Sequence, residues 1–160
     1  MLSTRSWMAA AMLASAAVFF AAPGPAQEFR TTLQVSQQAG GHCIEVSDRQ
    51  VRPGQHLEMR DCDNSVAQTF RYDPASAQLS IGGLCVDADN GQPADLVKLA
   101  PCGGAHQAWR LEPKNEFVKF IGMNNQCLDI RYGSTELGAL LQSWTCGEAE
   151  PNQLWRLQRK

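Results

Sequence analysis

Apolar residues occur in short runs along this chain, and turn-forming residues separate each run from the next. Within a run they alternate with polar residues or cluster over a few positions, which is typical of short β-strands. Pairs such as Pro53-Gly54, Gly82-Gly83 and Asn124-Asn125 stand between the runs and favour turns. After residue 26 no stretch keeps a helical period for ten residues. The pattern therefore predicts an all-β fold.

The runs give twelve candidate strands, four in each third of the chain that follows residue 26. They cover Thr32–Val35, Cys43–Val46, Leu57–Met59, Thr69–Tyr72, Leu79–Ile81, Cys85–Ala88, Leu96–Leu99, Ala108–Leu111, Phe117–Ile121, Cys127–Ile130, Ala139–Trp144 and Leu154–Leu157.

The thirds of the chain repeat one another. Cys43-Ile44-Glu45, Cys85-Val86-Asp87 and Cys127-Leu128-Asp129 recur at a constant spacing of 42 residues. Each is followed by a second cysteine and then by a Gln-x-aromatic triplet. These later features are Cys62, Cys102 and Cys146, and the triplets that begin at Gln68, Gln107 and Gln153. A period of about 40 residues indicates a supersecondary unit whose apolar face is covered by its neighbours.

The aromatic residues of the triplets are candidates for the core. Phe70, Trp109 and Trp155 occupy the same place in the three repeats. Burying one large aromatic side chain contributes a few kcal/mol of transfer free energy, on the order of 2 to 3. We therefore expect these rings to stabilise the fold rather than to bind a ligand.

Six cysteines allow 15 disulfide connectivities, and the repeat favours one of them. Pairing within each repeat joins Cys43 to Cys62, Cys85 to Cys102 and Cys127 to Cys146, which closes loops of similar size. A zinc site is the alternative. The chain has no Cys-x-x-Cys pair, and the cysteines of each proposed pair are 17 to 19 residues apart, so disulfides fit better than metal ligation.

Residues 1–26 have the composition of a secretory signal peptide. One basic residue, Arg5, precedes an apolar stretch from Trp7 to Ala22, and a Pro-Gly-Pro segment precedes Ala26. The apolar stretch is short of the ~20 residues that span a bilayer. We expect cleavage after Ala26 and a secreted or periplasmic protein without direct membrane insertion. An uncleaved anchor is the alternative, but no charged stop-transfer cluster follows Ala26.

Residues 27–160 fit one domain of ordinary size, with repeats at about 31–75, 76–115 and 116–160. The whole chain has 14 basic and 16 acidic residues. Without Arg5, 13 basic residues remain against 16 acidic ones, so the domain is mildly acidic. Nucleic-acid binding depends on clustered Lys and Arg, which are missing here, so a nucleic-acid partner is not expected.

In its repeated motifs and in the spacing between them, the chain resembles the ricin B-chain type lectins. The resemblance covers residues 27–160 and rests on the Cys-[Ile/Val/Leu]-[Asp/Glu] motif, the second cysteine and the Gln-x-Trp triplet or its Phe variant. It implies a β-trefoil, in which a six-stranded barrel is capped by three hairpins around a pseudo-threefold axis. It also implies one potential sugar pocket in each repeat, and glycans of the galactose or N-acetylgalactosamine type as partners.

Only the third repeat has the complete set of pocket residues that the resemblance implies. They are Asp129, Gln142, Trp144, Asn152 and Gln153. An indole can pack against the C–H face of a sugar, a carboxylate can accept hydrogen bonds from neighbouring hydroxyls, and an amide can both donate and accept. Gln153 recurs as Gln68 and Gln107, so we expect it to brace Asp129 and the local turn.

The other two pockets differ at these positions, and we expect neither to bind galactose. The second repeat keeps Asp87 but has Lys98, Ala100 and His106 where Gln142, Trp144 and Asn152 stand in the third. The first repeat departs further, with Glu45, Glu58, Arg60 and Ala67. A single site implies weak binding, because lectins gain affinity by joining several weak sites.

The sequence gives no sign of an enzyme or of a cofactor. It has no Gly-x-Ser-x-Gly motif and no phosphate-binding glycine loop, and pairing all six cysteines leaves none as a nucleophile. Two non-catalytic alternatives to a lectin stay open. One is a protein-interaction or toxin-delivery subunit with a residual sugar site, and the other is protease inhibition by an exposed loop.

Overall fold

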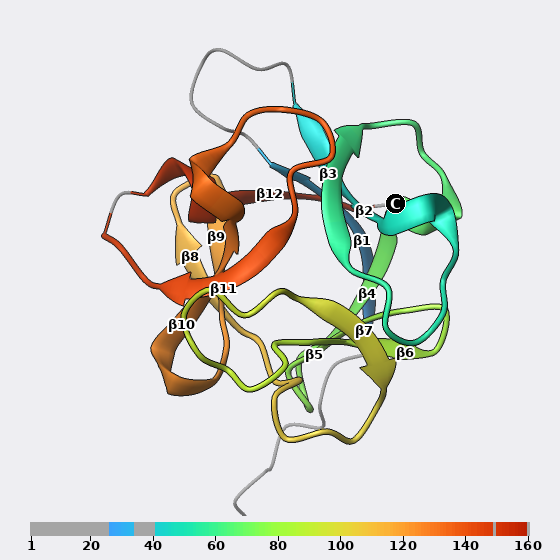
Figure 1. The fold of residues 1–160 in the computed structure, drawn as a ribbon, viewed down its shortest axis with the longest axis horizontal. Coiled ribbons are helices and arrows are strands. Elements are labelled where there is room, and N and C mark those ends of the chain that lie inside the picture. The colour runs from blue at the N-terminus through green and yellow to red at the C-terminus, as the bar shows by residue number, and fades with distance from the viewer. Residues whose placement is uncertain (1–25, 34–40, 149, 160) are drawn as a thin grey trace, which may run out of the picture.

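The computed structural model describes residues 26–33, 41–148 and 150–159. The predicted signal peptide lies outside these ranges except for Ala26. The described residues form twelve β-strands and five short 3-10 turns, which confirms the all-β prediction. The three repeats follow one another around the molecule (Figure 1). None of the helical turns in these ranges has the length and apolarity that a membrane crossing requires.

The strands belong to two groups. The first group consists of β1 (Gln27–Leu33), β4 (Thr69–Asp73), β5 (Gln78–Ile81), β8 (Arg110–Lys114), β9 (Phe117–Ile121) and β12 (Trp155–Arg159). The second consists of β2 (His42–Val46), β3 (Leu57–Asp61), β6 (Leu84–Asp87), β7 (Lys98–Pro101), β10 (Gln126–Ile130) and β11 (Leu141–Thr145).

The first group forms a six-stranded barrel. β1 pairs antiparallel with both β12 and β4, β4 pairs with β5, and β9 pairs with β8 and β12. An isolated bridge between Gln78 and Ala108 joins the β5 edge to the segment before β8, and the Trp109 N–H donates to the Ala77 carbonyl at 2.7 Å. These contacts bring the two ends of the sheet together.

The second group forms one hairpin in each repeat: β2–β3, β6–β7 and β10–β11. The segments that carry the second strand of each hairpin meet one another. The Leu57 N–H donates to the Val97 carbonyl at 3.3 Å, and the Val97 N–H donates to the Leu141 carbonyl at 3.1 Å. All three side chains are buried. A six-stranded barrel capped by three hairpins is the β-trefoil that the resemblance to the ricin B-chain type lectins implies.

The predicted core and disulfides are confirmed. Phe70, Trp109 and Trp155 are fully buried, and the two indole N–H groups donate to Val86 and Leu128 carbonyls within their own repeats, at 2.9 and 3.1 Å. The disulfides join Cys43 to Cys62, Cys85 to Cys102 and Cys127 to Cys146. All six cysteines are therefore paired, which excludes the zinc alternative.

The strand limits differ most from the prediction at the first strand. β1 begins at Gln27, five residues before the predicted start at Thr32, while the predicted end at Val35 lies outside the described residues. The early start has a long-range cause, because residues 27–30 pair with β4 and residues 29–33 pair with β12. β8 is shifted toward Pro113, which the strand tolerates beside its single partner β9.

Candidate functional site

Asp129 lies at the centre of the third repeat's hairpin. It stands on β10 directly opposite Gln142 on β11, and its side chain is almost completely buried. Because side chains alternate along a strand, Gln142 and Trp144 share one face of β11, whereas Ser143 points to the other. The strand pairing thus brings the carboxylate, one amide and one indole to the same side of the hairpin.

Three amide groups donate hydrogen bonds to the Asp129 carboxylate. Gln142 Nε2 donates to Oδ1 at 2.9 Å, while Asn152 Nδ2 and Gln153 Nε2 donate to Oδ2 at 2.5 and 2.9 Å. Asn152 and Gln153 belong to η5 (Pro151–Gln153), the turn before β12. A buried carboxylate needs such partners, since leaving it unpaired costs several kcal/mol, on the order of the desolvation penalty of an ion.

An open pocket lies above this carboxylate. It has a volume of about 330 Å³, and its lining includes Asp129, Gln142, Trp144 and Asn152. Trp144 is 44% exposed, unlike the other described tryptophans, which are fully buried. The indole therefore offers an accessible apolar surface within reach of a polar floor.

Burial raises the pKa of the Asp129 carboxyl above its ordinary value, because a desolvated carboxylate is disfavoured. The hydrogen bonds from Gln142 and Gln153 act in the opposite direction, and the negative charge of Glu150 adds to the rise. Sugar hydroxyls would need the ionised form as acceptor, so the protonation of this one group affects what the pocket can bind.

Gln153 braces the carboxylate against the turn that follows β11. Its Nε2 also donates to the Thr145 carbonyl at 3.1 Å, and its Oε1 accepts from the Gly147 N–H at 3.0 Å. Gln68 and Gln107 form the same set of bonds in the other repeats, each to the acidic residue after the first cysteine and to backbone groups beside the second cysteine. The brace is therefore a property of the repeat.

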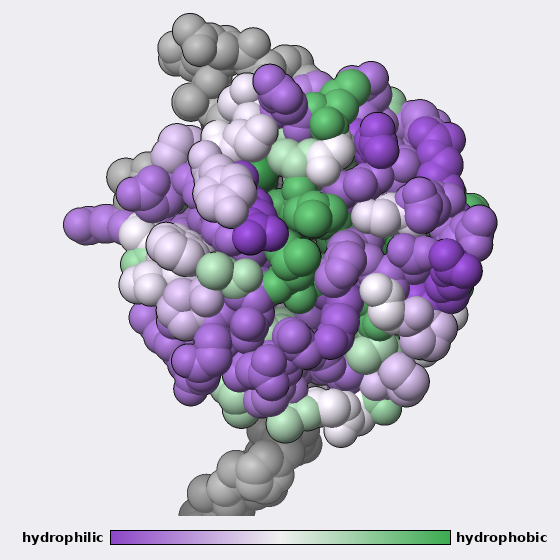
Figure 2. Space-filling view, viewed as in Figure 1, coloured by the Kyte–Doolittle hydropathy of each residue, from purple (hydrophilic) through white to green (hydrophobic). Residues whose placement is uncertain are grey.

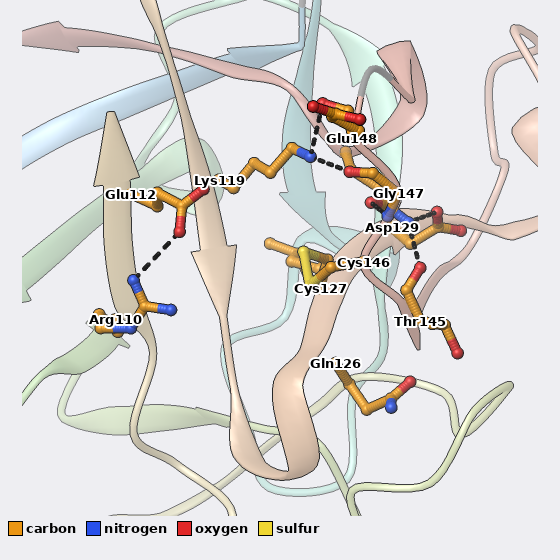
Figure 3. Close-up of a disulfide and its surroundings, with 12 residues drawn as sticks. Arg110, Glu112, Lys119, Gln126, Cys127, Asp129, Thr145, Cys146, Gly147 and Glu148 are labelled. Atoms are coloured by element: carbon orange, nitrogen blue, oxygen red, sulfur yellow. Dashed lines mark hydrogen bonds and ion pairs between the residues drawn. A yellow bond between two sulfur atoms is a disulfide. The ribbon is translucent and has the colours of Figure 1, made fainter. Parts of the chain in front are cut away.

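The third repeat has one further support on the barrel side. Figure 3 shows the ammonium of Lys119, from β9, pointing at the carbonyl groups of Gly147 and Glu148 beside the Cys127–Cys146 disulfide. Lys119 is buried, so these carbonyl groups accept the hydrogen bonds that water would accept from an exposed ammonium. Since Gly147 also donates to Gln153, the loop connects the barrel to the brace of Asp129.

A family model described as the ricin-type β-trefoil lectin domain matches residues 31–155. The chain belongs to this family. The ricin-type domain is a carbohydrate-binding lectin domain and is generally not catalytic, so the lectin prediction holds at the level of the family. The chain is also 40% identical over 43 residues to β-galactoside-specific lectin 2 of Viscum album. That match covers 26% of this chain and only 8% of the mistletoe protein.

Solved structures show the same fold as this ricin-type domain. The designed threefold-symmetric protein ThreeFoil superposes with a TM-score of 0.72 at 19% identity, covering 83% of this chain and 99% of ThreeFoil. The C-terminal half of an earthworm R-type lectin, solved in complex with GalNAc, superposes with a TM-score of 0.66 at 16% identity. That match covers 84% of this chain and 99% of the earthworm domain.

In the second repeat of this ricin-type domain, the residues equivalent to the third pocket make other contacts. Asp87 accepts from Gln107 Nε2 at 2.8 Å, as Asp129 does from Gln153. Lys98, however, bonds with Asp89 at 2.5 Å, and Ala100 stands where the third repeat has its indole. The second repeat therefore keeps the brace but lacks an aromatic surface.

The first repeat has a pocket of about 270 Å³ at the same place, but every residue that lines it is charged. Glu45, Asp48, Arg49, Glu58 and Arg60 form this lining. Arg49 Nε bonds with Glu45 at 3.2 Å, and Arg60 Nε bonds with Glu58 at 2.8 Å. Charged partners occupy the positions that Asp129, Gln142 and Trp144 hold in the third repeat.

Four residues that line the third pocket could not be predicted from the sequence. Arg131, Tyr132 and Gly133 form η4 (Arg131–Gly133), and Ala94 belongs to the second repeat. Tyr132 stands five positions after its cysteine, where the first repeat has Asp48 and the second has Asn90. The one sign in the sequence that Tyr132 has a special role is that its counterparts in the other two repeats are polar.

Proposed function

We propose that this lectin domain binds the galactose or N-acetylgalactosamine end of a glycan through one site in the third repeat. The site consists of Asp129, Gln142, Trp144, Asn152 and Gln153. The observation that carries the proposal is the exposed Trp144 indole beside a buried, amide-bonded Asp129 carboxylate. The mistletoe relative is named as β-galactoside-specific, and the earthworm neighbour was solved with GalNAc, which supports this choice of sugar.

The sugar stacks on the indole and bonds to the carboxylate. The C–H groups on one face of a galactose ring pack on Trp144, and two neighbouring hydroxyls point toward Asp129. A carboxylate has about four acceptor positions, and the three amides already use three of them. One hydroxyl can take the remaining position on Oδ1.

The second hydroxyl needs a rearrangement at Asn152. This residue is partly exposed, so its amide can turn from Asp129 to the sugar, donating to one hydroxyl oxygen while Oδ2 accepts from the second. Gln153 is fully buried and keeps its bonds. Asn152 is therefore the contact that exchanges partners, while Gln142 and Gln153 hold the carboxylate in place.

Calorimetric titration of the domain with galactose and N-acetylgalactosamine tests the proposal. A single shallow pocket suggests a dissociation constant near the millimolar level, or about 4 kcal/mol. We expect Trp144→Ala to abolish binding without unfolding the domain. Arg60→Ala changes the equivalent position of the first repeat and serves as the matched control. Equal binding by the Trp144→Ala variant would contradict the proposal.

We infer separately that the protein is exported. Its signal peptide is cleaved after Ala26, because β1 begins at the next residue, Gln27. Six paired cysteines also suit an oxidising compartment outside the cytosol. The intact mass of the protein recovered from culture medium or periplasm should match residues 27–160. A mass that includes the first 26 residues would contradict this inference.

A non-catalytic partner subunit is the second candidate. It is favoured by the loss of the aromatic surface from two of the three pockets, since a protein scaffold does not need three sugar sites. If the domain serves an assembly, a protein should co-purify in equal amount and Asp129→Asn should leave that complex intact. A purified, partner-free domain that binds galactose would favour the lectin proposal.

A further inference from the structure

Tyr132 has an unusual backbone and an unusual exposure for an aromatic residue. Its φ is +60°, in the left-handed region that favours glycine, asparagine and aspartate. Its side chain is 85% exposed, the highest value among the exposed large hydrophobic residues in the described part of the chain. The first repeat has Asp48 at this position with a φ of 58°, a residue type that tolerates this conformation. The fold therefore requires the turn but not the ring.

The Tyr132 ring also gains little from burial, so packing does not repay the backbone strain. Strained residues of this kind concentrate at ligand sites, where the strain serves function. Tyr132 lines the same pocket as Trp144 and Asp129. The pocket of the third repeat thus has two exposed aromatic side chains, one from η4 and one from β11, over a floor of polar groups.

Arg131 orders this edge of the pocket. Its guanidinium carbon lies 4.9 Å from the centroid of the Tyr132 ring, within the range of a cation–π contact. Within the described residues, the Arg131 Nε is buried and has no hydrogen-bond partner. Arg131 also lines the pocket, and its guanidinium has four further N–H donors, so this side of the pocket offers a ligand hydrogen-bond donors.

We propose that Tyr132 and Arg131 form an outer subsite for a second sugar, so that the pocket takes a glycan of at least two residues. The inference rests on the proposed function, in which the terminal galactose stacks on Trp144. The next sugar of the glycan packs its C–H face on Tyr132, and Arg131 holds the ring and donates toward the sugar hydroxyls.

The polar floor of this pocket favours a sugar over an apolar peptide. Asp129, Gln142 and Asn152 line the same pocket as the two rings and present carboxylate and amide groups to it. An apolar side chain in that position would leave these groups without water or a hydroxyl partner. A sugar has both a C–H face for each ring and hydroxyls for the polar groups.

The test compares monosaccharide and disaccharide affinities in the whole domain. The probes are methyl galactoside and a panel of galactosyl disaccharides with α and β 1→3, 1→4 and 1→6 linkages. We expect at least one disaccharide to bind about tenfold more tightly than methyl galactoside, the size of effect that one aromatic contact provides. In Tyr132→Asn, which suits a positive φ, that ratio should fall to about one. Tyr132→Phe keeps the ring and should keep the ratio.

The outcomes separate the two proposals. If methyl galactoside binds but no disaccharide binds more tightly, the outer subsite is wrong and the galactose site stands. If the Tyr132→Asn variant keeps the full ratio, the subsite is equally wrong. If the wild-type domain binds neither the monosaccharide nor any disaccharide, the galactose site fails and the subsite fails with it.

Discussion

Gln153 donates its side-chain amide to Asp129 across 24 positions of sequence, at 2.9 Å, and both side chains are almost completely buried. The same amide reaches the Thr145 carbonyl, and its oxygen accepts from Gly147. This relationship connects fold and function, because the residue that completes the repeat's hydrogen bonds also fixes the carboxylate of the proposed sugar site.

Replacing Gln153 by Ala should destabilise the domain and weaken sugar binding together. The change removes the bonds to two backbone groups and one of the two amide bonds to Asp129 Oδ2, at a cost of about 1 to 3 kcal/mol. Gln107→Ala is the matched control, because it removes the same bonds in the second repeat. Urea denaturation and galactose titration should show similar destabilisation in both variants but weaker binding only in Gln153→Ala. Equal loss of binding in both would contradict a local role.

Galactose binding should fall on acidification at a higher pH than for an ordinary carboxylate. Burial raises the pKa of Asp129, and Glu150 adds to the rise, so protonation removes the hydroxyl acceptor before an exposed Asp would titrate. Titrations between pH 3 and 7 should give an apparent pKa above 3.8, the ordinary value of Asp. Binding unaffected by pH over this range would contradict the role of the carboxylate.

The free energy of unfolding should depend on pH in the opposite direction to galactose binding. A pKa raised in the folded state contributes stability that is present below the pKa of the unfolded chain and is lost as pH rises through the folded pKa. The free energy of unfolding of the wild-type domain should therefore decline relative to Asp129→Asn as pH rises from 3, and the difference should then level off. Denaturation curves for both proteins over this range measure it. A difference that moves the other way would show that the folded protein favours the ionised carboxylate.

The disulfides should stabilise the three repeats to a similar extent, since their loops are of similar length. Removing one by paired Ser substitution should cost about 3 kcal/mol. Replacing Cys127 and Cys146 should also weaken galactose binding, because Trp144 on β11 pairs directly with Cys127 on β10. Replacing Cys85 and Cys102 is the control and should destabilise the domain without that additional effect. Binding and denaturation measured on the two paired variants distinguish these outcomes.

Tyr132→Asn should raise the stability of the domain while it lowers the preference for disaccharides. The ring is exposed and its backbone is strained, so the substitution removes a cost of about 1 kcal/mol and loses little packing. Thermal denaturation should show a higher midpoint than the wild type by several degrees, ~4 °C for a domain of this size. A lower midpoint would show that the Arg131–Tyr132 contact holds the turn together.

Much of the fold could be predicted because the residues that recur in each repeat are also the residues that stabilise the fold. The spacing of the cysteines and of the Gln-x-aromatic triplets predicted the disulfides and the buried rings, and the short apolar runs predicted the twelve strands. The start of β1 at Gln27 could not be predicted, because it depends on pairing with β4 and β12, which lie far away in sequence. The bridge that joins β5 to the segment before β8 is equally non-local.

The site could be predicted in part for the same reason. Asp129, Gln142 and Trp144 were predicted because the resemblance to the ricin-type lectins implies a pocket at these positions, and the pairing of β10 with β11 brings them to one face of the hairpin. Tyr132 could not be recognised, because its importance lies in a positive φ and an exposed ring. The surface in Figure 2 is mostly hydrophilic with a narrow hydrophobic strip, so hydropathy alone does not separate a ligand-binding aromatic residue from an ordinary exposed one.

The most direct test of the sugar site is an NMR titration of the indole N–H signals. The domain of residues 27–160 contains three tryptophans, of which Trp109 and Trp155 are fully buried and Trp144 is exposed. On addition of galactose to tens of millimolar, about ten times the expected dissociation constant, the Trp144 signal should shift along a saturating curve. The signals of Trp109 and Trp155 should stay in place as internal controls. A Trp144 signal that does not move over this range would contradict the account.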